Sequence, residues 1–227
     1  MIKQRIRNRL VRAVLPRMLH ASRTVELIRL GTSYGGWWVP VAQSRPGAIV
    51  YLAGAGEDIS LDRALHERGC VVRVFDPTPR AISHVREHGP KSESFRFQPV
   101  GLWDQDTSLR FYSPENPEHV SHSVVNLQGT LEYFEAEVRT LRTLMRTNGD
   151  QHIDLLKMDI EGAEHAVVHD ILTNGPLPET ICLEFDPPCS LGEIRRTAGA
   201  LRAAGYHLER VEVWNCTFTR AIIKPSS

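Results

Sequence analysis

Residues 48–60 read Ala-Ile-Val-Tyr-Leu-Ala-Gly-Ala-Gly-Glu-Asp-Ile-Ser, and this stretch decides the fold. The run Ala48–Ala53 is apolar and has the length of a buried strand. Gly54 and Gly56 follow it, and glycines there permit a tight turn and the close approach of a ligand to the backbone. Helical periodicity then extends over Glu57–Arg68. The succession of strand, glycine turn and helix predicts the first unit of a ligand-binding parallel sheet.

The chain after this unit alternates between strand and helix patterns. Further strands are expected at Val71–Phe75, Phe95–Val100, Ile153–Met158 and Thr180–Phe185, with a locally paired strand at Ser108–Tyr112. Helices are expected at Thr78–His88, Val138–Arg146, from Ala163, and at Leu191–Ala203. Two final strands near Tyr206–Val213 and Thr217–Ile223 have no helix between them. The pattern predicts an α/β fold: a mainly parallel, Rossmann-like sheet of seven strands with an antiparallel edge hairpin and helices on both faces.

Composition bounds the class of protein. A chain of 227 residues fits one domain, and 41% hydrophobic with 24% charged residues is typical of a soluble globular protein. The formal net charge of zero argues against a dedicated nucleic-acid binder. The four cysteines form no CxxC pair, and no apolar run approaches a membrane span or a signal peptide. A reduced, cytoplasmic location is therefore expected.

The first 30 residues differ from the rest. No acid precedes Glu26, whereas bases are frequent there: Lys3, Arg5, Arg7, Arg9, Arg12, Arg17 and Arg23. We expect residues 1–30 to form a basic extension of one or two helices, broken near Pro16, and residues 31–227 to form the domain. The extension either makes peripheral contact with an anionic membrane or packs on the domain with its arginines in water. Oligomeric state is not encoded in any recognisable pattern.

Two glycine- or proline-rich segments stand out between the regular elements. Residues 31–38 read Gly-Thr-Ser-Tyr-Gly-Gly-Trp-Trp, an aromatic link before the first strand of the sheet. Residues 113–130 are rich in Pro, Ser, Asn and His. A polar loop of that length in a compact domain is typical of a lid or binding loop.

The glycine turn is better suited to S-adenosylmethionine than to NAD. Asp76 follows Gly54 by 22 residues, at the end of the second strand, where an acid can bind both ribose hydroxyls. The third glycine of the dinucleotide fingerprint is absent, since Ile59 takes its place. Glu57 and Asp58 open the helix where a pyrophosphate would lie and would repel it. These acids also complement the helix dipole, and the two roles are compatible.

The sequence resembles the FkbM family of methyltransferases. The resemblance rests on residues 54–82, on VGLWDQD, on HVSHSVVN and above all on IDLLKMDIEGAE, and it extends in order over roughly residues 31–220. It implies the class I methyltransferase fold, S-adenosylmethionine as cofactor, and O-methylation of sugars or natural products. It also implies a set of cofactor contacts: Gly54, Ala55, Gly56, Asp58, Asp76 and Pro77, with Gly101 and Leu102 near the adenine and Tyr34 in the segment that covers the methionine end.

Carboxylates gather where a proton acceptor is needed. Asp159, Glu161 and Glu164 follow the fourth strand, and Glu184 and Asp186 end the fifth. Adjacent strand ends bring them to one rim, with Asp159 beside the cofactor and Glu161 and Glu184 facing the acceptor. Either glutamate is a candidate general base, and His122 in the polar loop is the rival.

Structural explanations compete with each of these roles. Glu161 and Glu164 also suit a helix cap, Glu184 a pair with Lys157, and His165 a packing role. Three acids suit a divalent cation, but no spacing demands one, so no metal is predicted.

Four functions are compatible with the sequence. The first is methyl transfer to a hydroxyl of a small-molecule acceptor, and N-methylation on the same fold is the second. The third is an NAD-dependent oxidoreductase, against which the residue at position 59 argues. The fourth is a silent binding module, which the acidic rim disfavours.

Overall fold

The computed structural model describes residues 15–16, 18–22, 24–112, 133–185 and 189–220. The predictions for the residues before 15, for the polar loop 113–130 with His122, and for Asp186 lie outside these ranges.

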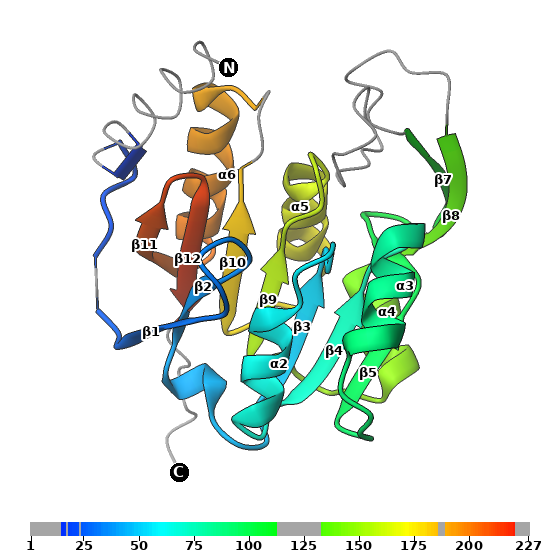
Figure 1. Cartoon of the computed structure of the whole chain (residues 1–227). Helices are drawn as coiled ribbons and strands as arrows, with labels where there is room; N and C mark the ends of the chain where they lie inside the picture. The colour runs from blue at the N-terminus through cyan, green and yellow to red at the C-terminus, as the bar shows by residue number, and fades with distance from the viewer. Residues whose placement is uncertain (1–14, 17, 23, 113–132, 186–188, 221–227) are drawn as a thin grey trace, which may run out of the picture.

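A seven-stranded sheet forms the centre of the described chain (Figure 1). Its order is β11-β12-β10-β9-β3-β4-β5, with β3 at Ile49–Ala53, β4 at Val71–Phe75, β5 at Phe95–Gln98, β9 at Leu155–Met158, β10 at Thr180–Glu184, β11 at Tyr206–Glu212 and β12 at Asn215–Arg220. The strands from β10 to β5 are parallel, whereas β12 is antiparallel to both β10 and β11. The predicted fold, including the edge hairpin, is confirmed.

Helices cover both faces of this sheet (Figure 1). They are α2 at Ser60–Glu67, α3 at Pro79–His88, α4 at Leu141–Asn148, α5 at Glu164–Asn174 and α6 at Leu191–Ala203. Because side chains alternate along a strand, each strand contributes to two cores. In β3, Val50 and Leu52 pack with residues of α2 and α3, while Tyr51 and Ala53 pack with residues of α4, α5 and α6. Each such buried side chain stabilises the fold by about 1.5–3 kcal/mol.

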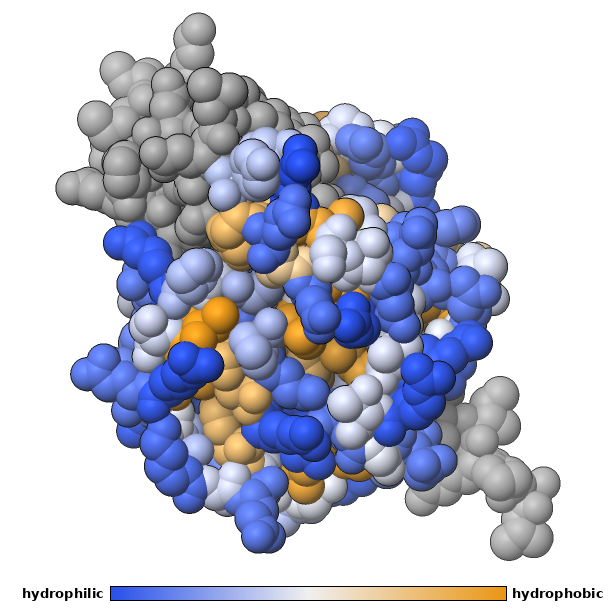
Figure 2. Space-filling view, turned by 90° about the vertical axis from the view of Figure 1, so that its right-hand side faces the viewer, coloured by the Kyte–Doolittle hydropathy of each residue, from blue (hydrophilic) through white to orange (hydrophobic). Residues whose placement is uncertain are grey.

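The outer helices keep polar faces toward solvent. In α3, Ala81 and Val85 are buried, and Arg86, Glu87 and His88 are exposed. Figure 2 shows the side of the molecule at the right of Figure 1, where hydrophilic residues predominate and apolar ones show between them. Within the described ranges, no helix combines the length and apolar character that crossing a membrane requires.

Three predicted boundaries are wrong. Leu27–Leu30, expected in a helix, is strand β1, which pairs antiparallel with β2 at Trp37–Pro40. Residues 138–139, also expected in a helix, end strand β8 at Tyr133–Arg139, and α4 begins only at Leu141 after the N-cap Thr140. Helix α2 begins at Ser60, not at Glu57.

The strand β8 belongs to a separate three-stranded sheet, in the order β6-β8-β7. Its partners are β6 at Gly101–Leu102 and β7 at Thr107–Tyr112. Along β8 the exposed residues Tyr133, Glu135 and Glu137 alternate with more buried ones, which is the period of a strand and not of a helix. The expected local pairing near Ser108–Tyr112 is confirmed.

Candidate functional site

A cavity of about 1390 Å³ opens at the carboxyl ends of the central strands. Its lining includes Gly54 after β3, Asp76 after β4, Asp159 after β9 and Glu184 at the end of β10. Ligands of open parallel sheets bind at this edge, so the position of the cavity is the one the fold predicts.

The turn after β3 has a backbone that only glycine accommodates. Gly54 has a φ of 83°, and a Cβ atom there would lie 1.8 Å from the carbonyl oxygen of Asp159. Gly56 has a φ of 53°, and a Cβ atom there would meet nothing within 4 Å. The first glycine therefore allows β3 and β9 to end in close contact, and the second leaves open space above the backbone, facing the cavity that it lines.

The buried carboxylate of Asp76 holds this turn in place. Its Oδ2 accepts hydrogen bonds from the backbone N–H groups of Ala55 at 2.9 Å and Gly56 at 3.0 Å. Its Oδ1 accepts from the N–H and the hydroxyl of Thr78 at 2.8 and 2.6 Å. Asp76 thus fixes the loop that lines the cavity, and it is itself one of the lining residues.

Asp58 connects the same region to the turn between β1 and β2. Because α2 begins at Ser60, Asp58 precedes the helix and accepts the Ser60 N–H at 2.9 Å. It also accepts hydrogen bonds from the hydroxyl of Thr32 and the N–H of Gly35. Burial raises the pKa of Asp58, but the hydrogen bonds from Ser60, Thr32 and Gly35 outweigh it and hold the pKa below its ordinary value.

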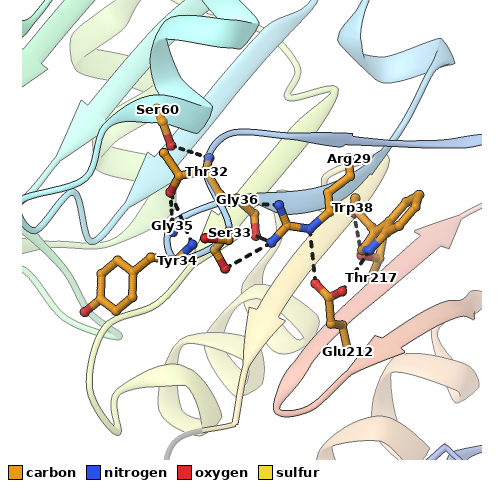
Figure 3. A network of polar contacts seen from close by, with 10 residues as sticks. All are labelled: Arg29, Thr32, Ser33, Tyr34, Gly35, Gly36, Trp38, Ser60, Glu212 and Thr217. Atoms are coloured by element: carbon orange, nitrogen blue, oxygen red, sulfur yellow. Dashed lines mark hydrogen bonds and ion pairs between the residues drawn. The ribbon is translucent and has the colours of Figure 1, made fainter.

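The turn that Asp58 holds also lines the cavity. Its backbone is further fixed by Arg29, whose guanidinium donates to the carbonyl oxygens of Thr32, Ser33 and Gly36 and lies 3.5 Å from the Glu212 carboxylate. The Tyr34 side chain extends away from this network in Figure 3, and it is 84% exposed. Tyr34 lines the cavity, where partial burial and the negative charges of Asp159, Glu161 and Glu184 raise the pKa of its hydroxyl.

Lys157 joins the ends of the two central strands. Its Nζ donates to the carbonyl oxygen of Gly54 at 2.6 Å and lies 3.2 Å from Oδ2 of Asp159. The ammonium group also lies 5.6 Å from the centroid of the Trp37 ring, a cation–π arrangement. Burial lowers the pKa of Lys157, but the carboxylates of Asp159 and Asp62 outweigh it and raise the pKa, so the lysine is charged.

The acidic rim is formed by Asp159, Glu161 and Glu184. Burial raises the pKa of Glu184 to about 8, and the charges of Asp159 and Glu161 add to that rise. Glu161 has a φ of 55°, in the left-handed region that a side chain rarely adopts. The turn that holds it is stabilised by Glu164, which accepts the N–H groups of Ile160 and Gly162. Glu164, the first residue of α5, therefore holds the turn that precedes the helix and is not a side-chain N-cap, whereas Glu161 lines the cavity.

The structure brings together all described residues that the sequence assigned to the site. They line one cavity: Tyr34, Gly54, Ala55, Gly56, Asp58, Asp76, Pro77, Gly101, Leu102, Asp159, Glu161 and Glu184. The cavity also contains Arg29, Glu212 and Trp214, which the sequence did not single out. Lys157 was anticipated only as a partner of Glu184, and its ion pair is with Asp159 instead. A charged residue inside the apolar strand Leu155–Met158 is the signal that marks it.

The lining fits a cationic, phosphate-free nucleoside. Acids outnumber bases around the cavity: Glu57, Asp58, Asp76, Asp159, Glu161, Glu184 and Glu212 against Arg29, Arg63 and Lys157. Arg29 and Lys157 are already bonded to protein oxygens. A pyrophosphate would meet this negative field unfavourably, whereas a sulfonium and an ammonium group would be attracted. Together with the open backbone at Gly56, this charge fits S-adenosylmethionine.

A comparison with family models agrees with this fit. A family model described as a methyltransferase FkbM domain matches residues 54–208. A search of curated proteins found no match. Among solved structures, a precorrin-6y C5,15-methyltransferase from Geobacter metallireducens is 10% identical, with 78% of this chain and 82% of that one covered and a TM-score of 0.44. A TehB-like S-adenosylmethionine-dependent methyltransferase from Corynebacterium glutamicum is 15% identical, with 79% and 84% covered and a TM-score of 0.42. Human N-acetylserotonin methyltransferase, in complex with S-adenosylmethionine, is 12% identical, with 80% and 49% covered and a TM-score of 0.38.

Proposed function

The chain belongs to the FkbM family of S-adenosylmethionine-dependent methyltransferases, and we propose that it methylates a hydroxyl oxygen of a small-molecule acceptor, a sugar or another natural product. The observation that carries this proposal is the carboxyl group of Glu184, held in a partly buried position at the cavity with a raised pKa. Hydroxyl groups are poor nucleophiles until a base accepts their proton, and a carboxylate of high proton affinity is suited to that task.

The family fixes the cofactor, and the residues that would hold it are those of the glycine turn and its surroundings. Gly54, Ala55 and Gly56 form the turn, Asp76 fixes it and would offer an acid to the ribose, and Gly101 and Leu102, which line the same cavity, would lie near the adenine. S-adenosylmethionine supplies an activated methyl group on a sulfonium. The protein has to orient the acceptor, exclude water and remove one proton.

Glu184 is the first choice for the proton acceptor. Its pKa of about 8 is far closer to the pKa of a hydroxyl than that of an ordinary glutamate, which makes proton transfer less unfavourable. Glu161 lines the same cavity, and its backbone lies in the left-handed region. We assign its side chain to hold the acceptor hydroxyl by a hydrogen bond. His122 remains a rival base, and its position lies outside the described residues.

Two variants test the assignment of roles. In Glu184→Gln, kcat should fall by about 10²–10⁴, the usual contribution of a general base, while the dissociation constant of S-adenosylhomocysteine stays within about threefold. In His122→Gln, kcat should be nearly unchanged. A normal rate in the first variant and a lost rate in the second would transfer the role of base to His122.

The acceptor atom is tested by the product. Purified enzyme is incubated with S-adenosylmethionine labelled with carbon-13 in the methyl group and with panels of sugars, hydroxylated natural products and their amines. A product whose labelled carbon resonates as a methoxy group supports the proposal. A labelled N-methyl product as the main outcome would overturn it in favour of N-methylation. Tight S-adenosylhomocysteine binding without turnover on any acceptor would favour a silent binding module.

A further inference from the structure

A second group of reactive side chains lies between α5 and α6, outside the cavity. The imidazole of His165, in the first turn of α5, has both nitrogen atoms engaged. Nδ1 lies 2.7 Å from the hydroxyl oxygen of Thr197 on α6, and Nε2 lies 2.9 Å from Sγ of Cys189. The ring stacks on Phe185, with 5.6 Å between centroids and an interplanar angle of 28°. Three residues, Phe185, Cys189 and Thr197, therefore hold the imidazole of His165 in one orientation.

The hydrogen-bond partners of the two ring nitrogens indicate which nitrogen of His165 carries the proton. Burial lowers the pKa of His165, so the ring is neutral near pH 7 and has one donor and one acceptor nitrogen. If the thiol of Cys189 donates to Nε2, then Nδ1–H donates to Thr197, and both contacts are satisfied. The imidazole is then placed to take the thiol proton, while the threonine hydroxyl holds the ring in the tautomer that can do so.

Two features of the surroundings stabilise the charged pair that this transfer produces, against the burial that lowers the pKa of His165. Cys189 directly precedes Ser190, the N-cap of the 13-residue helix α6, so the residue lies at the end of the helix where the dipole is positive, with its Sγ 3.6 Å from the Ser190 carbonyl oxygen. The carboxylate of Glu193 raises the pKa of His165, while Arg196 lowers it, and so Glu193 supports the imidazolium. Both a cationic imidazole and a helix N-terminus are recognised causes of a lowered thiol pKa.

The other three cysteines differ from Cys189 in the burial and in the surroundings of the thiol. Cys70, Cys182 and Cys216 are buried, and burial is the main cause that raises the pKa of each thiol. Cys189 is partly exposed and hydrogen-bonded to an imidazole. The chain thus contains its own controls for thiol reactivity.

We propose that Cys189 is a modification site: a thiol activated by His165 and Thr197 that reacts with small peroxides and other small electrophiles. With hydrogen peroxide, His165 accepts the thiol proton and the thiolate sulfur attacks one peroxide oxygen. A sulfur–oxygen bond forms, the oxygen–oxygen bond breaks, and the departing hydroxide takes the proton back as water. The sulfur is oxidised by two electrons to a sulfenic acid, and the peroxide is reduced to water.

The product would change the contact between α5 and the segment before α6. Sγ and Nε2 are 2.9 Å apart, which leaves no room for an added oxygen atom between them. Oxidation therefore has to separate the thiol from the ring or turn it away. The reactivity itself does not depend on methyl transfer, so it can be measured whether or not an acceptor is known.

The test is alkylation of the full-length protein by substoichiometric iodoacetamide at pH 6, followed by peptide mass spectrometry. Cys189 should react at least about fivefold faster than free glutathione, because the adjacent imidazole accepts the thiol proton and so increases the share of thiolate. His165→Gln should abolish this excess, and Thr197→Val, which keeps the shape of the side chain, should reduce it. Cys70, Cys182 and Cys216 should stay unlabelled until the protein unfolds.

Peroxide reactivity is read separately by trapping the sulfenic acid with dimedone after exposure to hydrogen peroxide. The adduct should appear at Cys189 and be absent in Cys189→Ser. Thermal unfolding of each variant verifies that α5 and α6 remain packed, and if His165→Gln does not fold, Thr197→Val carries the test. The proposal is overturned if Cys189 reacts no faster than glutathione, if the folded variants keep the full rate, or if peroxide leaves Cys189 unmodified.

Discussion

Replacing Glu184 with glutamine should make the protein more stable at alkaline pH while removing its base. The pKa of this carboxyl is raised from 4.5 to about 8, and the first cause is burial. A shift of that size corresponds to roughly 4–5 kcal/mol for ionising the group in the folded state. Because the carboxyl borders an open cavity and solvent screens it, we expect about 2 kcal/mol to be realised.

The sign follows from proton linkage. Below pH 4.5 Glu184 is protonated in both the folded and the unfolded state, so the substitution changes little. Between pH 4.5 and about 8 the unfolded state ionises first, and the wild type loses stability as pH rises. Above pH 8 the loss is complete. The stabilisation by Glu184→Gln should therefore grow from near zero at pH 4 to about 2 kcal/mol at pH 9, or roughly 4–8 °C in Tm for a chain of this length.

Differential scanning calorimetry at pH 4, 6.5 and 9 measures this directly. Glu93→Gln is the matched control, since Glu93 is exposed. Its Tm should track that of the wild type at every pH. We reason that burial and like charge disfavour the ionised Glu184 carboxylate. That reasoning would be refuted if Glu184→Gln were no more stable than the wild type at pH 9, or if its Tm rose by the same amount at pH 4.

Three further substitutions test the frame of the cavity. Lys157→Met leaves the Asp159 carboxylate without its ammonium partner, and calorimetry should show a loss of about 3 kcal/mol; a neutral result would mean that the pair contributes nothing net. Gly54→Ala should prevent folding or lower Tm far more than Gly56→Ala, because its Cβ would lie 1.8 Å from the Asp159 carbonyl while that of Gly56 meets open space. Asp76→Asn keeps the shape but replaces one of the two acceptor oxygens, which serve the Ala55 and Gly56 N–H groups on one side and Thr78 on the other, by an amide donor. It should weaken S-adenosylhomocysteine binding at least tenfold by titration calorimetry; an unchanged affinity would remove Asp76 from the site.

The sequence predicted the central sheet because its strands are buried on both faces and therefore read as short apolar runs. It failed where tertiary contacts decide the structure. Residues 27–30 contain Arg29, whose guanidinium donates a hydrogen bond to the β1–β2 turn and forms an ion pair with Glu212. Glu212 is 183 positions away in the chain, so no local pattern encodes this partner. Residues 133–139 alternate as a strand does, but no strand was expected there from the sequence and a helix was expected from Val138, whereas α4 begins at Leu141.

The candidate site likewise contains residues that the sequence could predict and contacts that it could not. Gly54, Asp76, Asp159 and Glu184 could be predicted because each follows a strand, and strand ends of a parallel sheet share an edge. The connection of Lys157 to the Gly54 carbonyl could not, since it depends on the register of β3 beside β9. The thiol–imidazole contact of Cys189 and His165 depends on how α5 packs against α6, which the spacing of the two residues does not reveal.

The raised pKa of Glu184 also bears on how the acidic rim accepts a cation. Near pH 7 the group is mostly protonated, so a positive charge bound in the cavity should lower its pKa and release a proton. Titration calorimetry of S-adenosylmethionine in two buffers of different ionisation enthalpy counts that proton. We expect up to one proton released at pH 7 by the wild type, fewer with the uncharged thioether S-adenosylhomocysteine, and none in Glu184→Gln. Equal release by the two ligands would mean that the ligand's positive charge does not reach Glu184, and the acid would then be tuned for the acceptor alone.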